Sequence, residues 1–396
     1  MAYLFHQPQW GRAKGYTPFI RGEVISTNYN RALVLDENNR LWSVRFKYGN
    51  PTYPGDSIVF KGYAKGSRVY IKHYNISRSF FQKIRVSVHS FLKERFLNAV
   101  RDKFARKLGS ALIFGENWFS KRERTKISHL GIYHLIVISG MHYALFLTFF
   151  LFIPVRWRLR WLIALLFFGF FTLFVLFPKA PAYRAFISVA LFLLAFLFEK
   201  PYNALKALLL AYAVSLLLYP HWLFNFGFWL SYLASLSLIL YFGTRKTPEE
   251  DYFVNFLSKS LGIEASLVVM VTISPILIYY LKYISFGTFL YSFAFTVITE
   301  VYLLIATLNL LSLWSIPPAV DLQIMVSKVF EYLYRIFPEN VYVKTASIPK
   351  WEMYLFIFIS LAILISPLSK VKKWLLLLVL FVLELVTFVG LNRLEI

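Results

Sequence analysis

The chain has 396 residues, of which 58% are hydrophobic and 16% charged, and it contains no cysteine. Soluble domains are usually about 45–50% apolar and about 25% charged, so this composition argues against a soluble globular enzyme. The lack of cysteine excludes disulfides, thiolate zinc sites and cysteine nucleophiles. The formal net charge is +23, and residues 1–127 carry 24 Lys and Arg against eight Asp and Glu. A basic first third on a hydrophobic body indicates a surface for nucleic acid or anionic lipid.

Residues 1–79 are predicted to form a small all-β domain. The first 18 residues hold no apolar run, so we expect neither a signal peptide nor a leading transmembrane helix. Turn-forming residues separate five short apolar or alternating segments, and five strands in so short a stretch favour an OB-like barrel. The predicted strands are Phe19–Thr27, Ala32–Leu35, Arg40–Lys47, Ser57–Tyr63 and Arg68–Tyr74.

Basic and aromatic side chains are interleaved along these predicted strands. Proteins that bind single-stranded nucleic acid combine a positive groove with aromatic rings that stack on the bases. The alternative is a barrel core surrounded by solvated lysines, in which Trp42 is an interior residue. The candidate contacts to a nucleic acid are Trp42, Arg45, Lys47, Tyr48, Lys61, Tyr63, Arg68, Tyr70 and Lys72.

Residues 80–127 are predicted to be basic amphipathic helices in the plane of the membrane. From Phe80 to Leu108 every fourth residue is apolar, and Lys and Arg fill much of the remainder. A period of four drifts by about 40° per step around an α-helix, so one straight helix cannot keep this stripe on one face. We therefore expect a break or bend, with the apolar face toward lipid and the cations toward anionic headgroups.

Residues 128–396 are predicted to be a helical body that crosses the membrane several times. The segment 284–312 is too long for one simple span and is expected to be broken or re-entrant, and Asp321–Phe337 is expected to be an interfacial helix. The predicted spans are 132–153, 161–177, 184–198, 205–219, 223–242, 264–281, 284–312, 351–366 and 374–391.

Short basic loops predict the orientation of these spans. The cations at 156–160, at 200–206 and at 245–246 follow the first, third and fifth spans and agree on a cytoplasmic side. This parity places the N-terminal domain on the external face of the membrane. The cations at 370–373 agree with it only if 284–312 crosses twice or turns back.

Polar residues interrupt the first predicted span. His134, Ser139, Gly140 and His142 lie in an apolar run, where polar side chains are costly unless they face protein or water. His134 and His142 are eight residues apart, so on one helix they would lie within about 80° of each other. The small pair Ser139-Gly140 permits close helix approach or local unwinding. The alternative is a helix-packing seam with capped imidazoles.

Two charged residues within predicted spans are further candidates for a function. Arg184 begins a short span, where it could contact phosphate in a channel or extend its guanidinium to the interface. Glu300 lies in apolar sequence, and an acid in the membrane is a candidate functional residue by default. Glu300 could also pair with a neighbouring hydroxyl or cation, or lie at a helix break.

Four segments in order resemble motifs of the ComEC competence family. Gly131–His142 resembles its Gly-x-x-His-Leu-x-x-x-Ser-Gly-x-His pattern, and Pro181–Ala185, Phe226–Tyr232 and Ser274–Tyr280 resemble three later motifs. The predicted barrel resembles the OB-like domain of the family. The resemblance implies a polytopic inner-membrane channel that imports single-stranded DNA during natural transformation. The channel positions that it carries over are His134, Ser139, Gly140, His142, Arg184, Gly227 and Ser231.

The chain also departs from the family pattern. Many members have a transmembrane helix before the barrel and a metallo-β-lactamase-like nuclease domain at the C-terminus, and we expect this chain to have neither. No His-x-His-x-Asp-His run and no nucleotide-binding loop occur in the sequence. We therefore expect no cofactor, no metal and no catalytic residues. A separate DNA receptor, nuclease and motor protein are implied as partners, and a homo-oligomer stays open.

Two other classes of function are consistent with the residues alone. An ion or small-molecule transporter could use His134, His142 and Glu300 as a proton relay, with the barrel as a regulatory cap. An intramembrane enzyme could use Ser139 with the histidines, although the setting is too apolar for spacing alone to indicate hydrolysis.

Overall fold

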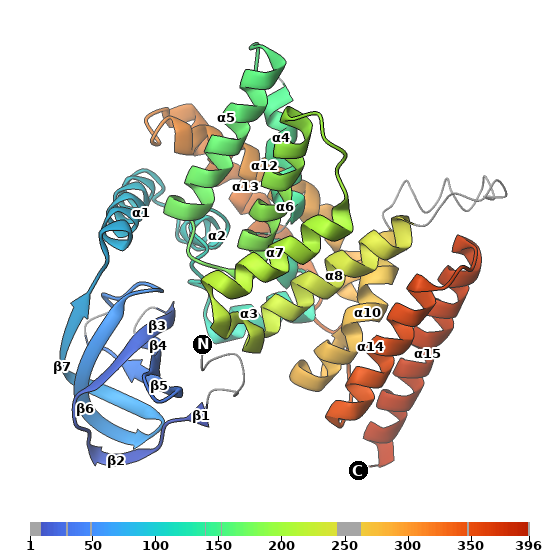
Figure 1. The fold of residues 1–396 in the computed structure, drawn as a ribbon, viewed down its shortest axis with the longest axis horizontal. Coiled ribbons are helices and arrows are strands. Elements are labelled where there is room, and N and C mark those ends of the chain that lie inside the picture. The colour runs from blue at the N-terminus through green and yellow to red at the C-terminus, as the bar shows by residue number, and fades with distance from the viewer. Residues whose placement is uncertain are drawn as a thin grey trace.

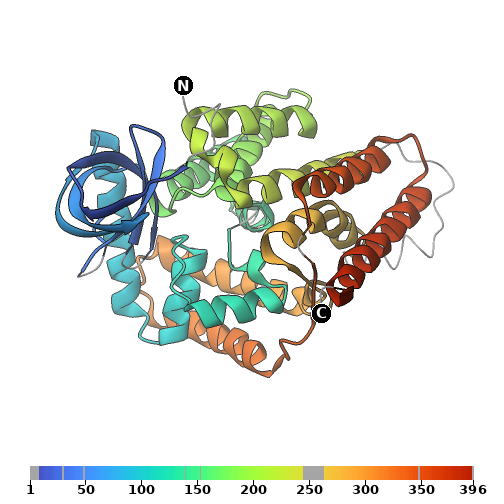
Figure 2. The ribbon, with the colours of Figure 1, turned by 90° about the horizontal axis from the view of Figure 1, so that it is seen from below.

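The structure is a computed structural model, and it describes residues 9–28, 31–47, 50–138, 140–151, 153–243, 263–346 and 348–394. A small β-barrel lies at one end of the molecule, and a helical body makes up the rest, with α14 (Lys350–Ile365) and α15 (Lys370–Leu394) at its far end (Figure 1). Seen from below, the barrel and these two C-terminal helices lie on opposite sides (Figure 2).

The barrel closes through strand β7. Strand β7 pairs in parallel with β5 and antiparallel with β6, while β4 and β3 complete the ring between β5 and β6. The five-stranded OB-like barrel predicted from the sequence is therefore confirmed, and two short strands are added to it. The strands are β1 (Gln9–Trp10), β2 (Ala13–Tyr16), β3 (Ile20–Asn28), β4 (Arg31–Asp36), β5 (Arg40–Arg45), β6 (Ser57–Gly66) and β7 (Arg68–Ser77).

The barrel interior is filled by alternate side chains of these strands. Val34, Val44, Phe60 and Val69 are completely buried there, as the period of two requires. The structure corrects one predicted contact, because Trp42 lies in this core and is only 4% exposed. Its indole N–H donates to Asp36 Oδ2 at 2.9 Å. A ring enclosed in this way cannot stack on a nucleobase.

The basic segment after the barrel breaks into two helices, as its drifting stripe predicts. Helix α1 (Phe80–Ala99) is followed by α2 (Lys103–Leu112), and Asp102 caps α2 by accepting a hydrogen bond from the Ala105 backbone N–H. From Leu92 to Leu108 the apolar stripe is buried in the core of the helical body. This part of the stripe therefore faces protein, whereas exposed apolar side chains earlier in α1, among them Phe80 and Ile84, remain free to face lipid.

The helical body contains four helices, within the described residues, that are long and apolar enough to cross a membrane. They are the continuous helix Trp157–Val175, whose last turn is a π-helix, and the helices Ala180–Leu197, Glu264–Leu281 and Ser292–Leu311. The chain is thus a membrane protein. The helices of the body are α3 (Lys121–His129), α4 (Gly140–Leu151), α5 (Trp157–Phe170), α6 (Ala180–Leu197), α7 (Ala204–Leu218), α8 (Phe226–Phe242), α10 (Ile263–Leu281), α11 (Gly287–Leu290), α12 (Ser292–Leu311), α13 (Pro317–Ile336), α14 (Lys350–Ile365) and α15 (Lys370–Leu394).

Two predicted spans are interrupted. The segment 284–312 is broken, as expected, into the end of strand β8 (Tyr283–Ser285), the single turn α11 and the long helix α12. The segment 132–153 is not one helix, because a 3₁₀ turn at Tyr133–Leu135 precedes α4, which begins only at Gly140. Gly131 starts this break with a φ of +71°, a left-handed conformation that a continuous α-helix cannot contain.

Candidate nucleic-acid interface and membrane motif cluster

Three of the predicted channel residues meet inside the helical body. Arg184 lies on the second turn of α6, and its Nε donates to Ser231 Oγ of α8 at 2.8 Å. A Cβ atom added to Gly140, the first residue of α4, would lie 3.3 Å from Arg184 Nη2. The guanidinium thus connects α6 and α8 and approaches the start of α4 closely because residue 140 has no side chain. These residues are called the motif cluster below.

Local sequence positions the members of the motif cluster. Pro181 lies in the first turn of α6, where its fixed φ favours helix initiation. Asn225 caps α8 by accepting a hydrogen bond from the Phe228 backbone N–H at 3.3 Å. A Cβ atom at Gly227 would lie 3.2 Å from this capping oxygen. Gly227 therefore leaves room for the cap that sets the start of α8, one turn before Ser231.

Arg184 carries a charge that has no acidic neighbour among the described residues. It is half-buried, and the salt bridges found among the described residues do not include it. The groups that face it electrostatically are the hydroxyls of Tyr232 and Tyr202. A guanidinium without a carboxylate partner keeps donors for a phosphate.

The two motif histidines lie on either side of the break. His142 is completely buried on α4, whereas His134 is exposed in the 3₁₀ turn before it. They are near enough to interact electrostatically. Because the helix is broken between them, the expected shared face of one helix is not what brings them together. Ser139 lies outside the described residues. Glu300 is half-buried on α12, and no described hydrogen bond joins it to the motif cluster.

The outer face of the barrel carries a row of tyrosines. Tyr16 of β2, Tyr63 of β6 and Tyr70 of β7 are direct cross-strand partners in register. Their exposed fractions are 68%, 49% and 43%, and the rings of Tyr16 and Tyr63 meet edge to face with centroids 5.9 Å apart. Exposed rings at this density are unusual for a solvated surface and provide platforms for stacking.

A row of cations lies beside the tyrosine row. Lys14, Lys65 and Arg68 are cross-strand partners on the same three strands, each two residues from a tyrosine of the row and therefore on the same face. Further cations cover the rings, since Lys72 lies 5.8 Å from the Tyr16 ring, Arg45 6.0 Å from Tyr70, and Lys61 5.4 Å from Phe19. We call these two rows and the cations beside them the aromatic–basic face.

Most of the predicted barrel contacts belong to this face. Lys47 is exposed beyond the end of β5, and Tyr48 lies outside the described residues. Tyr16 and Lys14 were missed by the sequence prediction because they precede its first strand. Their alternation around Gly15, in the run Lys14-Gly15-Tyr16, is the signal that could have identified β2.

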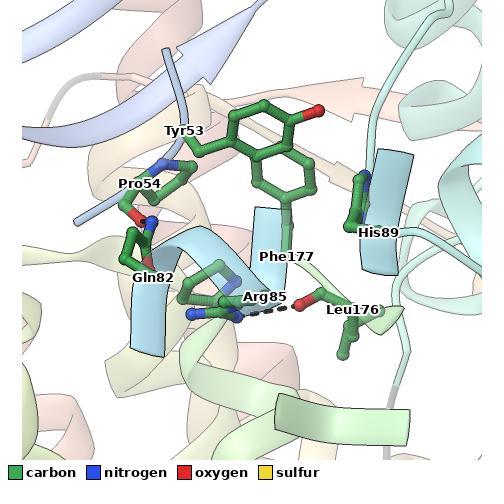
Figure 3. A pocket seen from close by; sticks show the side chains of 8 residues that line it. Tyr53, Pro54, Gln82, Arg85, His89, Leu176 and Phe177 are labelled. Atoms are coloured by element: carbon green, nitrogen blue, oxygen red, sulfur yellow. Dashed lines mark hydrogen bonds between the residues drawn. The ribbon is translucent and has the colours of Figure 1, made fainter. Parts of the chain in front are cut away.

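A buried ionic junction fixes the barrel on the body. Arg85 of α1 donates to the Leu176 carbonyl at 2.9 Å, and Tyr53 of the barrel stacks on Phe177 with centroids 5.2 Å apart (Figure 3). Nearby, His89 places Nδ1 2.6 Å from the Val175 carbonyl and Nε2 3.0 Å from Glu116 Oε1. We call this group the ionic junction.

Glu116 is ionised at the ionic junction. Burial would raise the pKa of Glu116, but hydrogen bonds from His89 and the charge of Lys93, whose Nζ is 2.6 Å away, lower it to about 2. Both partners of the His89 ring are therefore pure acceptors. The His89 ring thus bridges the Val175 carbonyl and the Glu116 carboxylate.

Comparison with known proteins identifies the family. The family model described as "Competence protein" matches residues 112–373, which is more than half of the chain. The chain belongs to the competence protein family. The part of this competence protein that matches contains the motif cluster and most of the helical body, and it begins after the barrel. No cluster of three His, Asp or Glu side chains able to hold a metal occurs in the described part of the chain.

Two relatives show how much of the chain is shared. The competence protein is 28% identical over 265 residues to an uncharacterized protein of Aquifex aeolicus (strain VF5), covering 65% of this chain and 60% of that one. It is 30% identical over 149 residues to ComE operon protein 3 of Bacillus subtilis (strain 168), covering 37% of this chain and 19% of that one. The chain thus spans less than two thirds of either relative. No solved structure matches it significantly.

Proposed function

We propose that this protein is an inner-membrane channel for uptake of single-stranded DNA during natural transformation. The aromatic–basic face supports this proposal most directly. Three exposed tyrosines in cross-strand register, with a parallel row of cations two residues away, match what a single strand offers, namely bases to stack and phosphates to neutralise. Membership of the competence family agrees with a role in DNA uptake.

In this proposal the barrel lies on the external face and receives the DNA strand. Each base stacked on an aromatic ring is worth about 1–3 kcal/mol, so three rings support measurable affinity without sequence preference. Arg184 in the motif cluster then contacts phosphates within the membrane, where its charge has no described carboxylate partner. The exposed basic surface of α1 adjoins anionic headgroups. A separate DNA receptor, nuclease and motor act with the channel, and the channel itself has no catalytic role.

The direct test uses the full-length protein in nanodiscs and a fluorescent oligothymidine. The double variant Tyr63→Ala/Tyr70→Ala should weaken binding by at least tenfold, while Tyr63→Phe/Tyr70→Phe, which keeps both rings, should bind almost like the wild type. Equal affinity of the Ala and wild-type proteins would refute the stacking role. In a competent host, deletion of the gene should abolish transformation by free DNA, and unchanged transformation would refute the uptake function.

An ion or small-molecule transporter is the second candidate. It is favoured by one observation, the placement of two titratable side chains on either side of one helix break, with His134 exposed in the turn before α4 and His142 buried on α4. Proteoliposomes loaded with a pH-sensitive dye distinguish the two functions. Proton flux that is lost in His142→Gln, together with no oligonucleotide binding at low salt, would favour the transporter.

A further inference from the structure

We propose that α12 and α13 cross the membrane together as an antiparallel hairpin, and that a charged strip along α13 lines a water-filled path through the bilayer. The strip consists of Asp321, Lys328, Glu331 and Arg335. This inference does not depend on DNA being the solute. It replaces the expectation that Asp321–Phe337 is an interfacial helix.

Contacts along their whole length make the two helices a hairpin. Near the open end, Phe295 of α12 meets Phe330 of α13 with ring centroids 4.8 Å apart. In the middle, Gln323 Nε2 donates to the Tyr302 hydroxyl at 2.9 Å. Near the turn, Asn309 Nδ2 donates to Gln323 Oε1 at 2.8 Å. Buried polar contacts of this kind hold neighbouring membrane helices together.

A small sheet closes the open end of the hairpin. Strand β8 precedes α12, strand β9 (Tyr342–Lys344) follows α13, and the two strands pair antiparallel with Tyr283 opposite Lys344. The two outer ends of the hairpin therefore lie on one side of the membrane. Consequently α12 and α13 either both cross the bilayer or both remain outside it, and a crossing by α12 alone is excluded.

The composition of α12 and the lengths of both helices decide between these two arrangements. Helix α12 has 20 residues and is apolar enough to span, and α13 has 20 residues as well. At about 1.5 Å per residue each is on the order of 30 Å long, which matches the hydrocarbon core. Since α13 lies beside α12 over its full length, it must pass through the same slab.

The orientation of the other helices agrees with a double crossing. With α12 and α13 counted as two spans, the basic residues at 370–373 lie on the same side as those at 156–160 and 200–206, as the positive-inside rule requires. Helix α3, which precedes the first predicted span, touches the sheet at the open end. The Tyr283 hydroxyl donates to Ser128 Oγ at 2.6 Å, and His129 stacks on Tyr342 with centroids 3.8 Å apart.

The surface of α13 divides into three arcs at about 100° per residue. One arc is buried against the body and contains Val320, Gln323, Val326, Ser327 and Phe330. A second arc of about 80° is apolar yet exposed, and it contains Leu322, Met325, Val329, Tyr332 and Ile336. The third arc, also of about 80°, contains the charged strip and the partly buried Ile324. The apolar arc suits lipid, whereas the charged strip does not.

Lys328 shows why the strip needs water. It is exposed and lies near the middle of α13, on the order of 12 Å from the nearer helix end. A charge at the bilayer centre costs about 2.5–3.5 kcal/mol even on the most permissive scale. Arg335 and Glu331 offset part of their own cost by pairing at 2.6 Å, but the described salt bridges do not include Lys328.

A polar cavity adjoins the C-terminal end of α13. It has a volume of about 380 Å³ and is lined by Tyr334 and Glu339 together with charged side chains of α2 and α3, among them Lys107, Arg122 and Lys126. Tyr334, which lines the cavity, is three residues from Glu331 and therefore neighbours this strip residue on the helix surface. In our proposal, water reaches the strip from this cavity past Tyr334.

The first experiment tests the double crossing by cysteine labelling, for which the chain offers no background because it has no cysteine. Ser315→Cys and Asn340→Cys are placed in exposed positions beyond the two ends of α13. In intact spheroplasts an impermeant maleimide should label only Asn340→Cys, and Ser315→Cys should react only after permeabilisation. Labelling of both from the same side would overturn the double crossing.

The second experiment tests the water-filled path. Lys328→Cys on the strip and Met325→Cys on the apolar arc are compared in membranes with a charged, impermeant methanethiosulfonate. Lys328→Cys should react at least tenfold faster, and Arg335→Cys serves as a second strip position if Lys328→Cys folds poorly. Equal reaction rates at the two positions would overturn the water-filled path. A disulfide crosslink between the strip positions of two copies of the chain would also overturn it, because the strip would then face a second copy and not water. Neither readout involves DNA, so its failure is distinguishable from failure of the uptake function.

Discussion

Arg184 shows how a glycine in one helix can set the position of a charge in another. Its guanidinium donates to Ser231 and lies beside Gly140, so the three helices α4, α6 and α8 converge on one cation. Such a group can exchange a serine hydroxyl for a phosphate oxygen without a carboxylate to displace first. Gly140 and Ser231 therefore set the position of the Arg184 guanidinium.

A methyl group at residue 140 should disturb this position. In Gly140→Ala the new Cβ would lie 3.3 Å from Arg184 Nη2, so the guanidinium must move by a few tenths of an ångström. We expect transformation to fall roughly tenfold, equivalent to about 1.4 kcal/mol. Gly169→Ala is the matched control, because its nearest neighbour would be 3.8 Å away. Equal transformation by both variants at equal expression would contradict this role of Gly140.

The ionic junction predicts a pH-dependent loss of stability. The pKa of Glu116 is lowered from 4.5 to about 2, so ionised Glu116 stabilises the fold fully above about pH 4.5 and loses this contribution as the pH falls toward 2. We expect Glu116→Gln to cost about 3 kcal/mol at pH 7 and much less near pH 2. Thermal unfolding of purified protein at both pH values measures this. A difference that is independent of pH would contradict the assignment.

At the scale of secondary-structure elements, the register of the barrel strands aligns side chains across the sheet. Because β2, β6 and β7 are in register, rings and cations fall into two straight rows, and neither row is visible in any one strand. The number of cations on the face sets the salt dependence of binding to a single strand, at about 0.7 per phosphate contact.

Removal of two cations from the aromatic–basic face should therefore weaken the salt dependence of DNA binding. In Lys65→Gln/Arg68→Gln we expect the plot of log affinity against log salt concentration to become shallower by about 1.4. Arg40 is an exposed cation at the other end of β5 from Arg45, so Arg40→Gln should leave the slope unchanged. Fluorescence anisotropy with a labelled oligonucleotide over a salt series provides the slopes. An unchanged slope in the double variant would place the DNA strand elsewhere.

The side-chain amide of Gln323 contributes three of the hydrogen bonds that hold the hairpin of α12 and α13 together. Gln323 accepts from Asn309 and Trp314 and donates to Tyr302, all within 3.3 Å. Gln323→Met keeps the volume but leaves buried polar groups without partners, so we expect a loss of about 1–3 kcal/mol. Ser327→Ala should cost less, because that hydroxyl bonds only a carbonyl of its own helix. Chemical unfolding in detergent compares them, and equal losses would contradict the role of Gln323.

At the scale of the whole molecule, the sequence predicts elements well where one period dominates. The five strands follow from alternation, and the break between α1 and α2 follows from a stripe that drifts around a helix. The prediction was less successful where a backbone conformation or a distant partner decides. The turn at Tyr133–Leu135 depends on the positive φ of Gly131. The direction of α13 depends on Gln323 and on strands that are 59 residues apart in the chain.

The candidate sites divide in the same way. Arg184, Ser231 and Gly140 could be selected from motifs, but only the fold shows that they meet. Tyr63 and Tyr70 could be selected from composition, whereas Trp42 looks identical in sequence and is buried because it falls on the inward phase of β5. Tyr16 was missed because it precedes the first predicted strand, and its four-residue strand β2 gives only a short alternating signal.

The ionic junction would fix the direction in which a DNA strand passes from the barrel to the helical body. A receptor on a flexible tether captures its ligand at any angle and must then lose orientational entropy before delivery. Here the barrel is anchored by buried charges and stacked rings at the end of the π-helical turn, five residues before the first turn of α6. A DNA strand held on the aromatic–basic face would already point in one fixed direction relative to Arg184. The orientational entropy of the barrel is therefore lost once, during folding, and not at each delivery of DNA.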